Sequence, residues 1–310
     1  MAENLHFALE ECYKARSAFF WRKVRASPFK DWQRQARSAT WKNLVWDWEA
    51  LGITPMARAA ADRLGFVPSE VFAHPEVLSA SPELEDYYRL LACLPNKGLG
   101  QIRSSAERGK RMDLCRLLNS MLSSLLAAAA KASRESLLHT IFAEAGTEWQ
   151  GTWVNSIGLQ AAQAVEQMLT NFAVRENLLD PVATAKLLEK ANGFVLKNGT
   201  VLLFGSEPDV ECRSKDKDLI YVIEIKGSAD KAGAQTRLGE TKKSFTKAKL
   251  ENPRCYTIFL PSVLTDAVRS QLRTERDIDQ VFNLLEILND ETKREEFLKE
   301  LFKYQLRAEF

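Results

Sequence analysis

Three polar side chains in the C-terminal half of the chain have the types and spacing needed for metal-assisted hydrolysis. Asp209 and Glu224 are separated by fourteen residues, and Lys226 follows two positions after Glu224. Carboxylate oxygens suit Mg²⁺, which can polarise a phosphate, orient a water molecule and stabilise a leaving oxygen. A neighbouring lysine limits the repulsion between the carboxylates and offsets charge that develops during phosphodiester hydrolysis. The pattern therefore predicts a magnesium-dependent nuclease.

A predicted β-hairpin brings these three residues together. The polar residues 215–218 form the expected turn, between strands expected at 209–213 and 219–226. A hairpin folded about the midpoint of that turn sets Asp209 opposite Glu224, with Cβ atoms ~4.5–5.5 Å apart. Lys226 lies two residues beyond Glu224 and so shares its face of the strand. Because an apolar run precedes them, as in a central strand, these charges need a metal, a partner or water.

The elements around the hairpin predict an α/β core, with a mixed sheet flanked by helices. Alternating apolar runs and the Asn198-Gly199 turn signal indicate two further strands before it, at 194–196 and 201–204. A helix at 229–251 and a buried strand at 255–260 are expected after it. Three helices are expected to follow, over 263–272, 276–288 and 290–308.

In the first ~190 residues, apolar residues recur mainly with the period of a helix, and helix-breaking residues separate the segments. We expect residues 1–150 to form a helical region, serving as a DNA-binding or dimerisation subdomain, and 151–310 to form the nuclease core. A loop is expected around Pro68 and Pro75. The expected helices cover 3–26, 29–50, 56–64, 82–94, two or three segments within 99–145, and 152–178.

Composition excludes several other classes of protein. The chain has 43 Lys and Arg against 41 Asp and Glu, which neither demands nor excludes a nucleic-acid partner, because a nuclease needs only a basic groove. Five scattered cysteines without a CxxC pair indicate free thiols, and three distant histidines argue against a zinc site or histidine triad. With no signal-peptide core and no apolar run of ~18–20 residues, we expect a cytoplasmic protein without membrane spans.

The hairpin residues also carry a family resemblance. Pro208-Asp209, fourteen residues, and then Glu224-Ile225-Lys226 resembles the motif of PD-(D/E)XK nucleases. The resemblance implies that Asp209, Glu224 and the carbonyl of Ile225 hold Mg²⁺ and that Lys226 is the catalytic lysine. Many members add an acidic residue from a preceding helix, and Glu166 is the candidate here.

Three further segments are similar to XcyI-like restriction endonucleases. They are VFAHPEVL at 71–78, ELEDYYRLLACLPNKGL at 83–99 and EIKGSADKAGAQTRLGETKKSF at 224–245. This resemblance implies a type II enzyme of a restriction-modification system that cuts double-stranded DNA within CCCGGG as a homodimer. A structure-selective repair nuclease or resolvase, and a non-catalytic DNA-binding protein, are the alternatives.

Basic residues outside the motif are candidate DNA contacts, because arginine and glutamine read base edges and cations hold phosphates. Ordinary solvated helix surfaces are the alternative for each group. The first group, after the motif, is Lys231, Gln235, Arg237, Lys242 and Lys243. The second is Arg103, Arg108, Lys110, Arg111 and Arg116, and the hairpin turn adds Arg213 and Lys215.

Three other features allow two interpretations each. Glu211 shares the strand face of Asp209, so it either joins the site or is solvated or paired with a lysine. Five tryptophans within the first fifty residues either pack between helices or stack on bases. The apolar face of the C-terminal helix, with Phe297, Leu301 and Phe302, either forms a dimer interface or packs on its own domain.

Overall fold

The chain divides into two units, seen here in a computed structural model. The structure describes residues 2–96, 108–128, 133–227 and 234–306. The N-terminal unit holds residues 15–152, and the nuclease unit holds residues 1–14 with 153–310. Helices α1 (Ala2–Ala26) and α9 (Arg134–Arg175) contribute residues to both units.

A six-stranded mixed sheet forms the centre of the nuclease unit, with its strands in chain order. β1 to β4 pair antiparallel, whereas β4, β5 and β6 pair in parallel. The strands are β1 (Gly193–Val195), β2 (Val201–Phe204), β3 (Val210–Arg213), β4 (Leu219–Lys226), β5 (Tyr256–Pro261) and β6 (Gln280–Val281). The sheet and its flanking helices confirm the mixed α/β architecture expected from the sequence.

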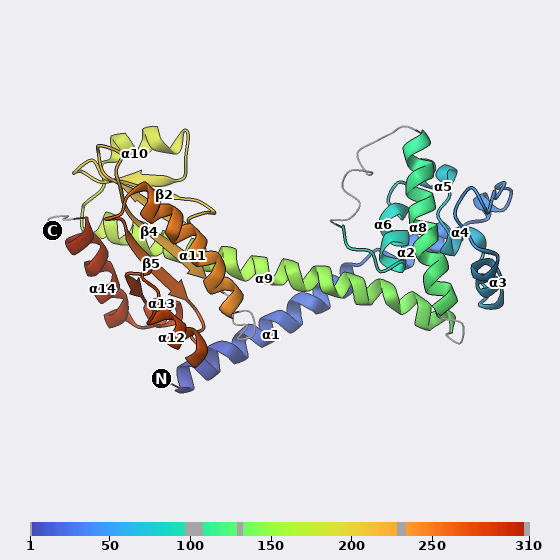
Figure 1. Cartoon of the computed structure of the whole chain (residues 1–310), viewed down its shortest axis with the longest axis horizontal. Coiled ribbons are helices and arrows are strands. Elements are labelled where there is room, and N and C mark those ends of the chain that lie inside the picture. Colours follow the sequence, from blue (N-terminus) through green and yellow to red (C-terminus); the bar gives the residue numbers. More distant parts are fainter. Residues whose placement is uncertain (1, 97–107, 129–132, 228–233, 307–310) are drawn as a thin grey trace. The chain divides into compact units, whose positions relative to one another are not determined.

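Helices cover both faces of this sheet. One face, with Ile223 and Ile225, packs against α9 and the C-terminal helices. The other face, with Val222, packs against α11 (Ala234–Glu251), which runs beside β4 in Figure 1. Alternate residues of β4 therefore serve opposite faces, and Glu224 and Lys226 share the α11 face with Val222. The remaining helices of the unit are α10 (Pro181–Leu188), α12 (Asp266–Leu272), α13 (Leu284–Asn289), α14 (Glu291–Lys299) and a π-helical turn (Glu300–Gln305).

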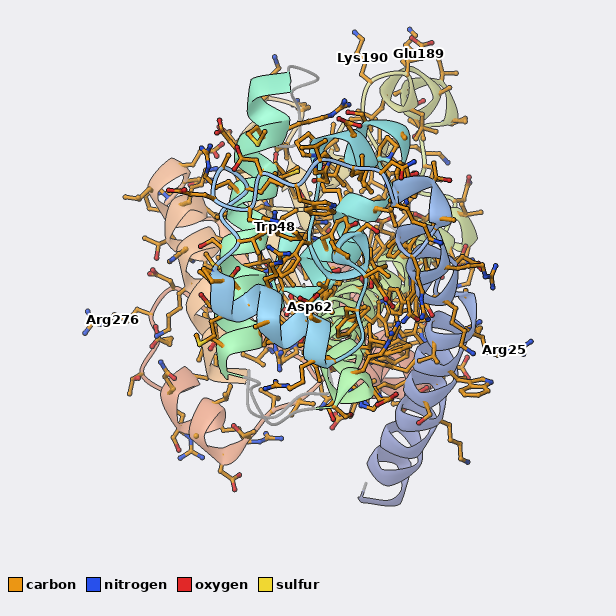
Figure 2. All side chains as sticks on the ribbon, turned by 90° about the vertical axis from the view of Figure 1, so that its right-hand side faces the viewer. Arg25, Trp48, Asp62, Glu189, Lys190 and Arg276 are labelled. Atoms are coloured by element: carbon orange, nitrogen blue, oxygen red, sulfur yellow. The ribbon has the colours of Figure 1, made fainter. Side chains whose placement is uncertain are left out.

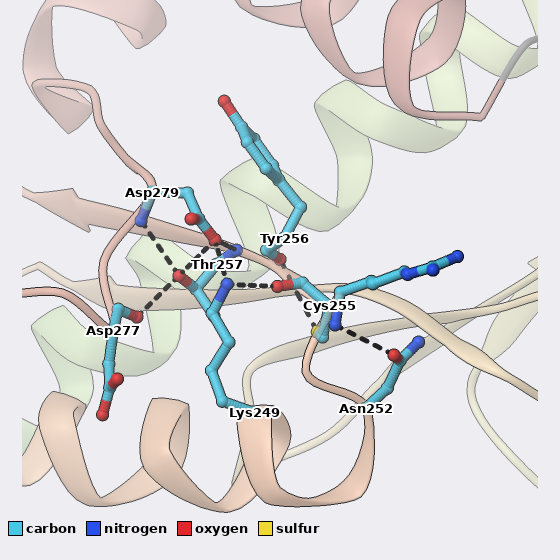
Figure 3. A network of polar contacts seen from close by, with 8 residues as sticks. Lys249, Asn252, Cys255, Tyr256, Thr257, Asp277 and Asp279 are labelled. Atoms are coloured by element: carbon cyan, nitrogen blue, oxygen red, sulfur yellow. Dashed lines mark hydrogen bonds and ion pairs between the residues drawn. The ribbon is translucent and has the colours of Figure 1, made fainter.

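The helix expected at 276–288 is wrong, because its first part forms strand β6. Asp279 fixes this segment to β5: its carboxylate accepts the Thr257 amide at 2.8 Å and pairs with Lys249 at 2.6 Å (Figure 3). The helix begins only at Leu284, where the side chain of Asn283 caps its first amides. A side-chain network from two other elements thus overrides the local helical pattern.

The N-terminal unit is helical around a buried core that includes Phe72, Tyr87, Tyr88 and Leu118. Four of the five early tryptophans, Trp32, Trp41, Trp46 and Trp48, pack partly buried against that core, as the packing interpretation expected, whereas Trp21 is 62% exposed. Trp48, labelled in Figure 2, stacks on Trp46 with ring centroids 5.2 Å apart. Among its described residues, the helices confined to this unit are α2 (Phe29–Ala36), η1 (Ala39–Trp41), α3 (Pro55–Arg63), α4 (Pro68–Val71), α5 (Pro75–Ala80), α6 (Leu84–Leu91) and α8 (Arg108–Ala128).

Several expected boundaries in the helical region are wrong. The helix expected at 29–50 ends at Ala36, because Ser38 leaves the helical conformation and caps a separate turn. Pro68 and Pro75, expected in a loop, each begin a short helix, since proline is tolerated in a first helical turn. The break expected between 145 and 152 is absent, and α9 continues through it for 42 residues.

The apolar face of the C-terminal helix packs on its own unit. Phe297, Leu298, Leu301 and Phe302 are at most 1% exposed and belong to the same core cluster as Ile223. These side chains are therefore not available as a dimer surface, so that interpretation is wrong. No helix in the described ranges is long and apolar enough to cross a membrane.

Candidate active site

The β3–β4 hairpin positions the predicted catalytic residues as expected. Val210 pairs with Ile223, so the register continued by one residue sets Asp209 opposite Glu224. The expected four-residue turn is wrong, because the connection is the five residues 214–218. The register shifts between Cys212 and Arg213, and this bulge adds one residue to β4, which compensates for the odd turn length.

Hydrogen bonds hold the three side chains together at the end of β4. Oδ2 of Asp209 accepts the amide of Ile225 at 2.7 Å. Nζ of Lys226 donates to Oε2 of Glu224 at 2.8 Å and lies 4.0 Å from Oδ2 of Asp209. The structure therefore brings together Asp209, Glu224, Lys226 and the backbone of Ile225.

Burial and mutual repulsion make this cluster electrostatically unusual. The side chains of Asp209, Glu224 and Lys226 are only 16%, 4% and 22% exposed. Burial first, and then the charge of Glu224, raise the pKa of Asp209 to about 6. Burial alone would lower the pKa of Lys226, but Glu224 and Asp209 raise it above its usual value. Perturbed carboxyls in a cluster are typical of functional sites.

The donor set fits a divalent cation. Oε1 of Glu224 is buried and has no hydrogen-bond partner among the described residues, so a carboxylate oxygen is left unsatisfied. Asp209 adds a second carboxylate, whose ionised form is unfavourable even with the ammonium group of Lys226 4.0 Å away. The described ranges hold no group of three or more His, Cys, Asp or Glu side chains placed for a metal. Two carboxylates, completed by water and substrate oxygens, match the coordination preference of Mg²⁺, which usually keeps several water ligands.

Neighbouring elements fix the end of β4. The amide and the hydroxyl of Ser262, at the end of β5, each donate to the carbonyl of Lys226 at 3.0 Å. Gly227 has no side chain, and α9 comes so close that a Cβ there would overlap the Cβ of Ala161. Helix α9 thus packs directly against the backbone that follows Lys226.

Sequence reasoning missed one acidic residue near the site. Glu240, on α11, raises the pKa of Lys226 by its negative charge. Its position follows from the packing of α11 on the face of β4 that carries Glu224. The only sequence signal was its place in the helix that follows the motif, which by itself selects no residue.

Two other carboxylates lie outside the cluster's hydrogen bonds. Glu166 accepts a 3.3 Å hydrogen bond from Asn192, just before β1, and α9 covers the sheet face opposite to Glu224. Its role as a further acidic ligand stays a prediction. Glu211 forms an ion pair with Arg213, so it is paired with an arginine rather than joined to the site.

The candidate DNA contacts are scattered over the chain. Arg213 and Lys215 lie at the turn end of the hairpin, away from Asp209, and Arg213 pairs with Glu251 at 2.5 Å. Arg237 and Lys242 lie on α11, where Lys242 pairs with Glu275. Arg111 donates to Ser79 at 2.7 Å beside a cavity of ≈ 500 Å³ in the N-terminal unit. Arg108 begins α8 and Gln235 lies in the first turn of α11, whereas Lys231 and Arg103 fall outside the described residues.

Comparison with known proteins decides the family. The model of the XcyI restriction endonuclease family matches residues 58–306, which is most of the chain and includes the whole hairpin. The chain belongs to this family. It is 28% identical to the type II restriction enzyme XcyI of Xanthomonas campestris pv. cyanopsidis over 232 residues, covering 66% of this chain and 68% of that enzyme. Membership in the XcyI family makes the chain a restriction endonuclease, a DNA hydrolase, and confirms the expected resemblance.

The family match also covers much of the N-terminal unit. It begins at residue 58 and therefore takes in α4, α5, α6 and α8. Residues 1–57, with α1, α2 and the first tryptophans, precede the match. Both units of this chain thus contain sequence that is typical of XcyI-family enzymes.

Proposed function

We propose that the protein is a Mg²⁺-dependent type II restriction endonuclease whose active site is a PD-(D/E)XK cluster of Asp209, Glu224 and Lys226. It hydrolyses phosphodiester bonds in double-stranded DNA at a palindromic sequence, with CCCGGG as the first candidate. A palindrome is cut on both strands, so a homodimer with one cluster per strand is the expected assembly. The family membership supports DNA cleavage, and the cluster geometry supports this choice of residues.

The observation that carries the proposal is the unsatisfied carboxylate of Glu224. A buried oxygen without a donor is costly, and the partner that Lys226 provides satisfies only the other oxygen of the same group. Bound Mg²⁺ would supply the missing positive charge and the Lewis acidity for phosphate hydrolysis. Asp209, Glu224 and the carbonyl of Ile225 are the groups that would hold it.

The chain's own residues have separable roles. The amide of Ile225 fixes the carboxylate of Asp209 toward the cluster through a 2.7 Å hydrogen bond. Lys226 is held protonated by two neighbouring carboxylates, so at neutral pH it offers a positive charge to the scissile phosphate. Ser262 holds the backbone of Lys226, which keeps its side chain in register with Glu224.

The test is digestion of a plasmid of known sequence in Mg²⁺, followed by sequencing of the new ends. Discrete ends at one palindromic sequence are expected, and their stagger gives the cut positions on both strands. Cuts at junctions or damaged sites only would instead indicate a structure-selective nuclease. Absence of cleavage in both Mg²⁺ and Mn²⁺ on any DNA would overturn the proposal.

A further inference from the structure

A group of cations near the start of the N-terminal unit is not used by the proposed active site. Residues 15–42 contain eight Lys or Arg and one acidic residue, Asp31, although the two signs nearly balance over the whole chain. Six of the eight are exposed. We call these six the α1–α2 basic strip: Arg22, Arg25, Lys30, Arg34, Arg37 and Lys42.

Helical geometry aligns these side chains. Phe29 and Ala36 anchor α2 in the core, while Lys30, Arg34 and Arg37 follow the i, i+4, i+7 spacing of one exposed face. Arg22 and Arg25 are three residues apart on α1, and Figure 2 shows Arg25 extending outward from its ribbon.

One aromatic residue anchors both parts of the strip. The ring of Trp149 stacks on Phe29 of α2, with centroids 6.1 Å apart. The same ring contacts Phe20 of α1 edge-on at 6.4 Å. The two helices that carry five of the six cations, with Arg37 at the C-terminal end of α2, therefore pack against the same residue of α9 within the N-terminal unit.

Most of the strip's charge is not neutralised by the protein. Arg22, Arg25, Lys30 and Lys42 make no ion pair with any residue in the described ranges. Arg34 pairs with Asp31 at 3.1 Å, but both side chains are largely exposed, so this pair contributes little stability. Arg37 lies 4.0 Å from the buried carboxylate of Glu70, which partly neutralises its charge. Exposed cations without acidic partners attract a polyanion, which supplies the missing negative charge.

The spacing suits a DNA strand. Lys30 to Arg37 spans about 10 Å along α2, and phosphates of one strand recur every ~3.4 Å of duplex axis. We propose that the α1–α2 basic strip binds the phosphate backbone of duplex DNA and supplies sequence-independent affinity. The strip precedes residue 58, where the family match begins. The inference rests on the proposed function only in taking duplex DNA as the substrate.

The test removes four charges and compares a matched control. The strip variant carries Arg22→Gln, Arg25→Gln, Lys30→Gln and Lys42→Gln. The control carries Lys186→Gln, Lys190→Gln, Arg273→Gln and Arg276→Gln, which are two lysines and two arginines of the nuclease unit, exposed and without a described ion pair. Lys190 and Arg276 are labelled in Figure 2.

Binding of fluorescent duplexes is measured in Ca²⁺, which prevents cleavage, over a range of salt concentrations. The slope of log affinity against log salt should fall by about 3–4 in the strip variant and by less than about 1 in the control. The strip variant should lose the same factor in binding affinity for a duplex with the cleaved sequence and for a duplex of random sequence. The strip variant should still cut plasmid at the wild-type positions, with the wild-type single-turnover rate at saturating DNA.

Three results would overturn the strip proposal. The first is an unchanged slope of log affinity against log salt in the strip variant. The second is a loss of affinity for only one of the two duplexes. The third is a change in the sedimentation coefficient, which would mean that the strip is an interface between two copies of the chain. These three results do not depend on the active site. Cleavage of plasmid by the wild-type protein tests the proposed function in a separate experiment. If the fourfold variant has a lower melting temperature than the wild-type protein, two double variants replace it, one at Arg22 and Arg25 and one at Lys30 and Lys42. Each should lower the slope of log affinity against log salt by about 2.

Discussion

The amide of Ile225 donates a 2.7 Å hydrogen bond to Oδ2 of Asp209 across the hairpin. This bond fixes the side chain of Asp209 from the strand that carries Glu224 and Lys226, so one register sets all three groups. A carboxylate held in this way cannot turn to solvent to relieve its repulsion from Glu224. The ionised cluster therefore lowers the stability of the metal-free protein, and the proposed Mg²⁺ would offset that cost.

Asp209→Asn is expected to stabilise the metal-free protein by about 1–2 kcal/mol at pH 7.5, less than the full pKa shift would give because some solvent screening remains. Burial and Glu224 raise the pKa of Asp209 from 3.8 to about 6, so its charged form is unfavourable in the folded state. The cost is absent below pH 3.8, where folded and unfolded chains both carry the neutral acid, and it is complete above pH 6. Urea unfolding at pH 7.5 measures the difference.

Melting experiments with added Mg²⁺ show whether Asp209→Asn acts through the metal site or only through general stabilisation of the fold. The wild-type protein should melt at higher temperature as Mg²⁺ is added, because binding favours the folded state, and Asp209→Asn should lose most of that response. A variant that is less stable than wild type without metal, or that keeps the full Mg²⁺ response, would contradict the assignment of Asp209.

Lys226→Gln is expected to slow single-turnover cleavage by about 10²–10³-fold while DNA affinity in Ca²⁺ stays nearly unchanged. The reason is that Lys226 contacts Glu224 at 2.8 Å inside the cluster, and in the proposed function it acts on the reacting phosphate rather than on the duplex as a whole. Rates and affinities are measured on the same cleaved duplex. Equal losses in affinity and rate would show that Lys226 is only a DNA contact.

Gly227→Ala should destabilise the protein by about 1–3 kcal/mol and reduce cleavage. The added methyl group would overlap the Cβ of Ala161 and lie 3.2 Å from the carbonyl oxygen of Ile157, so α9 must move away from the end of β4. Gly239→Ala is the control, because nothing lies within 4 Å of its Cβ position on α11 and alanine favours helix. Chemical unfolding compares both variants, and equal stability of the two would be inconsistent with this packing.

Arg134→Met should destabilise the N-terminal unit by about 2–3 kcal/mol, because it leaves the buried carboxylate of Glu70 with only Arg37, 4.0 Å away, as an ion-pair partner among the described residues. Adding Glu70→Gln to that variant should restore part of the loss. Arg116→Met is the matched control, since Arg116 pairs with Asp113 at 3.3 Å on an exposed surface and should change stability by under about 1 kcal/mol. A loss in Arg134→Met as small as in the control would mean that Glu70 finds another partner.

The sequence predicted the strand register at the candidate active site because strand periodicity and a polar turn are local signals. Asp209 lies opposite Glu224 as expected, although the turn and the bulge each differ by one residue from the simple hairpin. Neither difference is visible locally, because a bulge depends on how β4 twists against its neighbours.

Features set by distant contacts could not be predicted from local pattern. Strand β6 forms because Asp279 bonds to Thr257 and Lys249, which belong to other elements. Glu240 comes close to Lys226 only after α11 has packed on the sheet. The end of α2 at Ala36 is likewise a result of capping by Ser38, which competes with a continuing amphipathic pattern.

The central claim is tested most directly by single-turnover cleavage with Asp209→Asn and Glu224→Gln, on the duplex that end mapping identifies. Each variant is first titrated onto that duplex in Ca²⁺ to establish that it still binds, and cleavage is then started with Mg²⁺. Both should bind the duplex yet show no cleavage over times in which the wild-type enzyme cuts completely. Cleavage by either variant at the wild-type rate would contradict the assignment of this cluster as the active site.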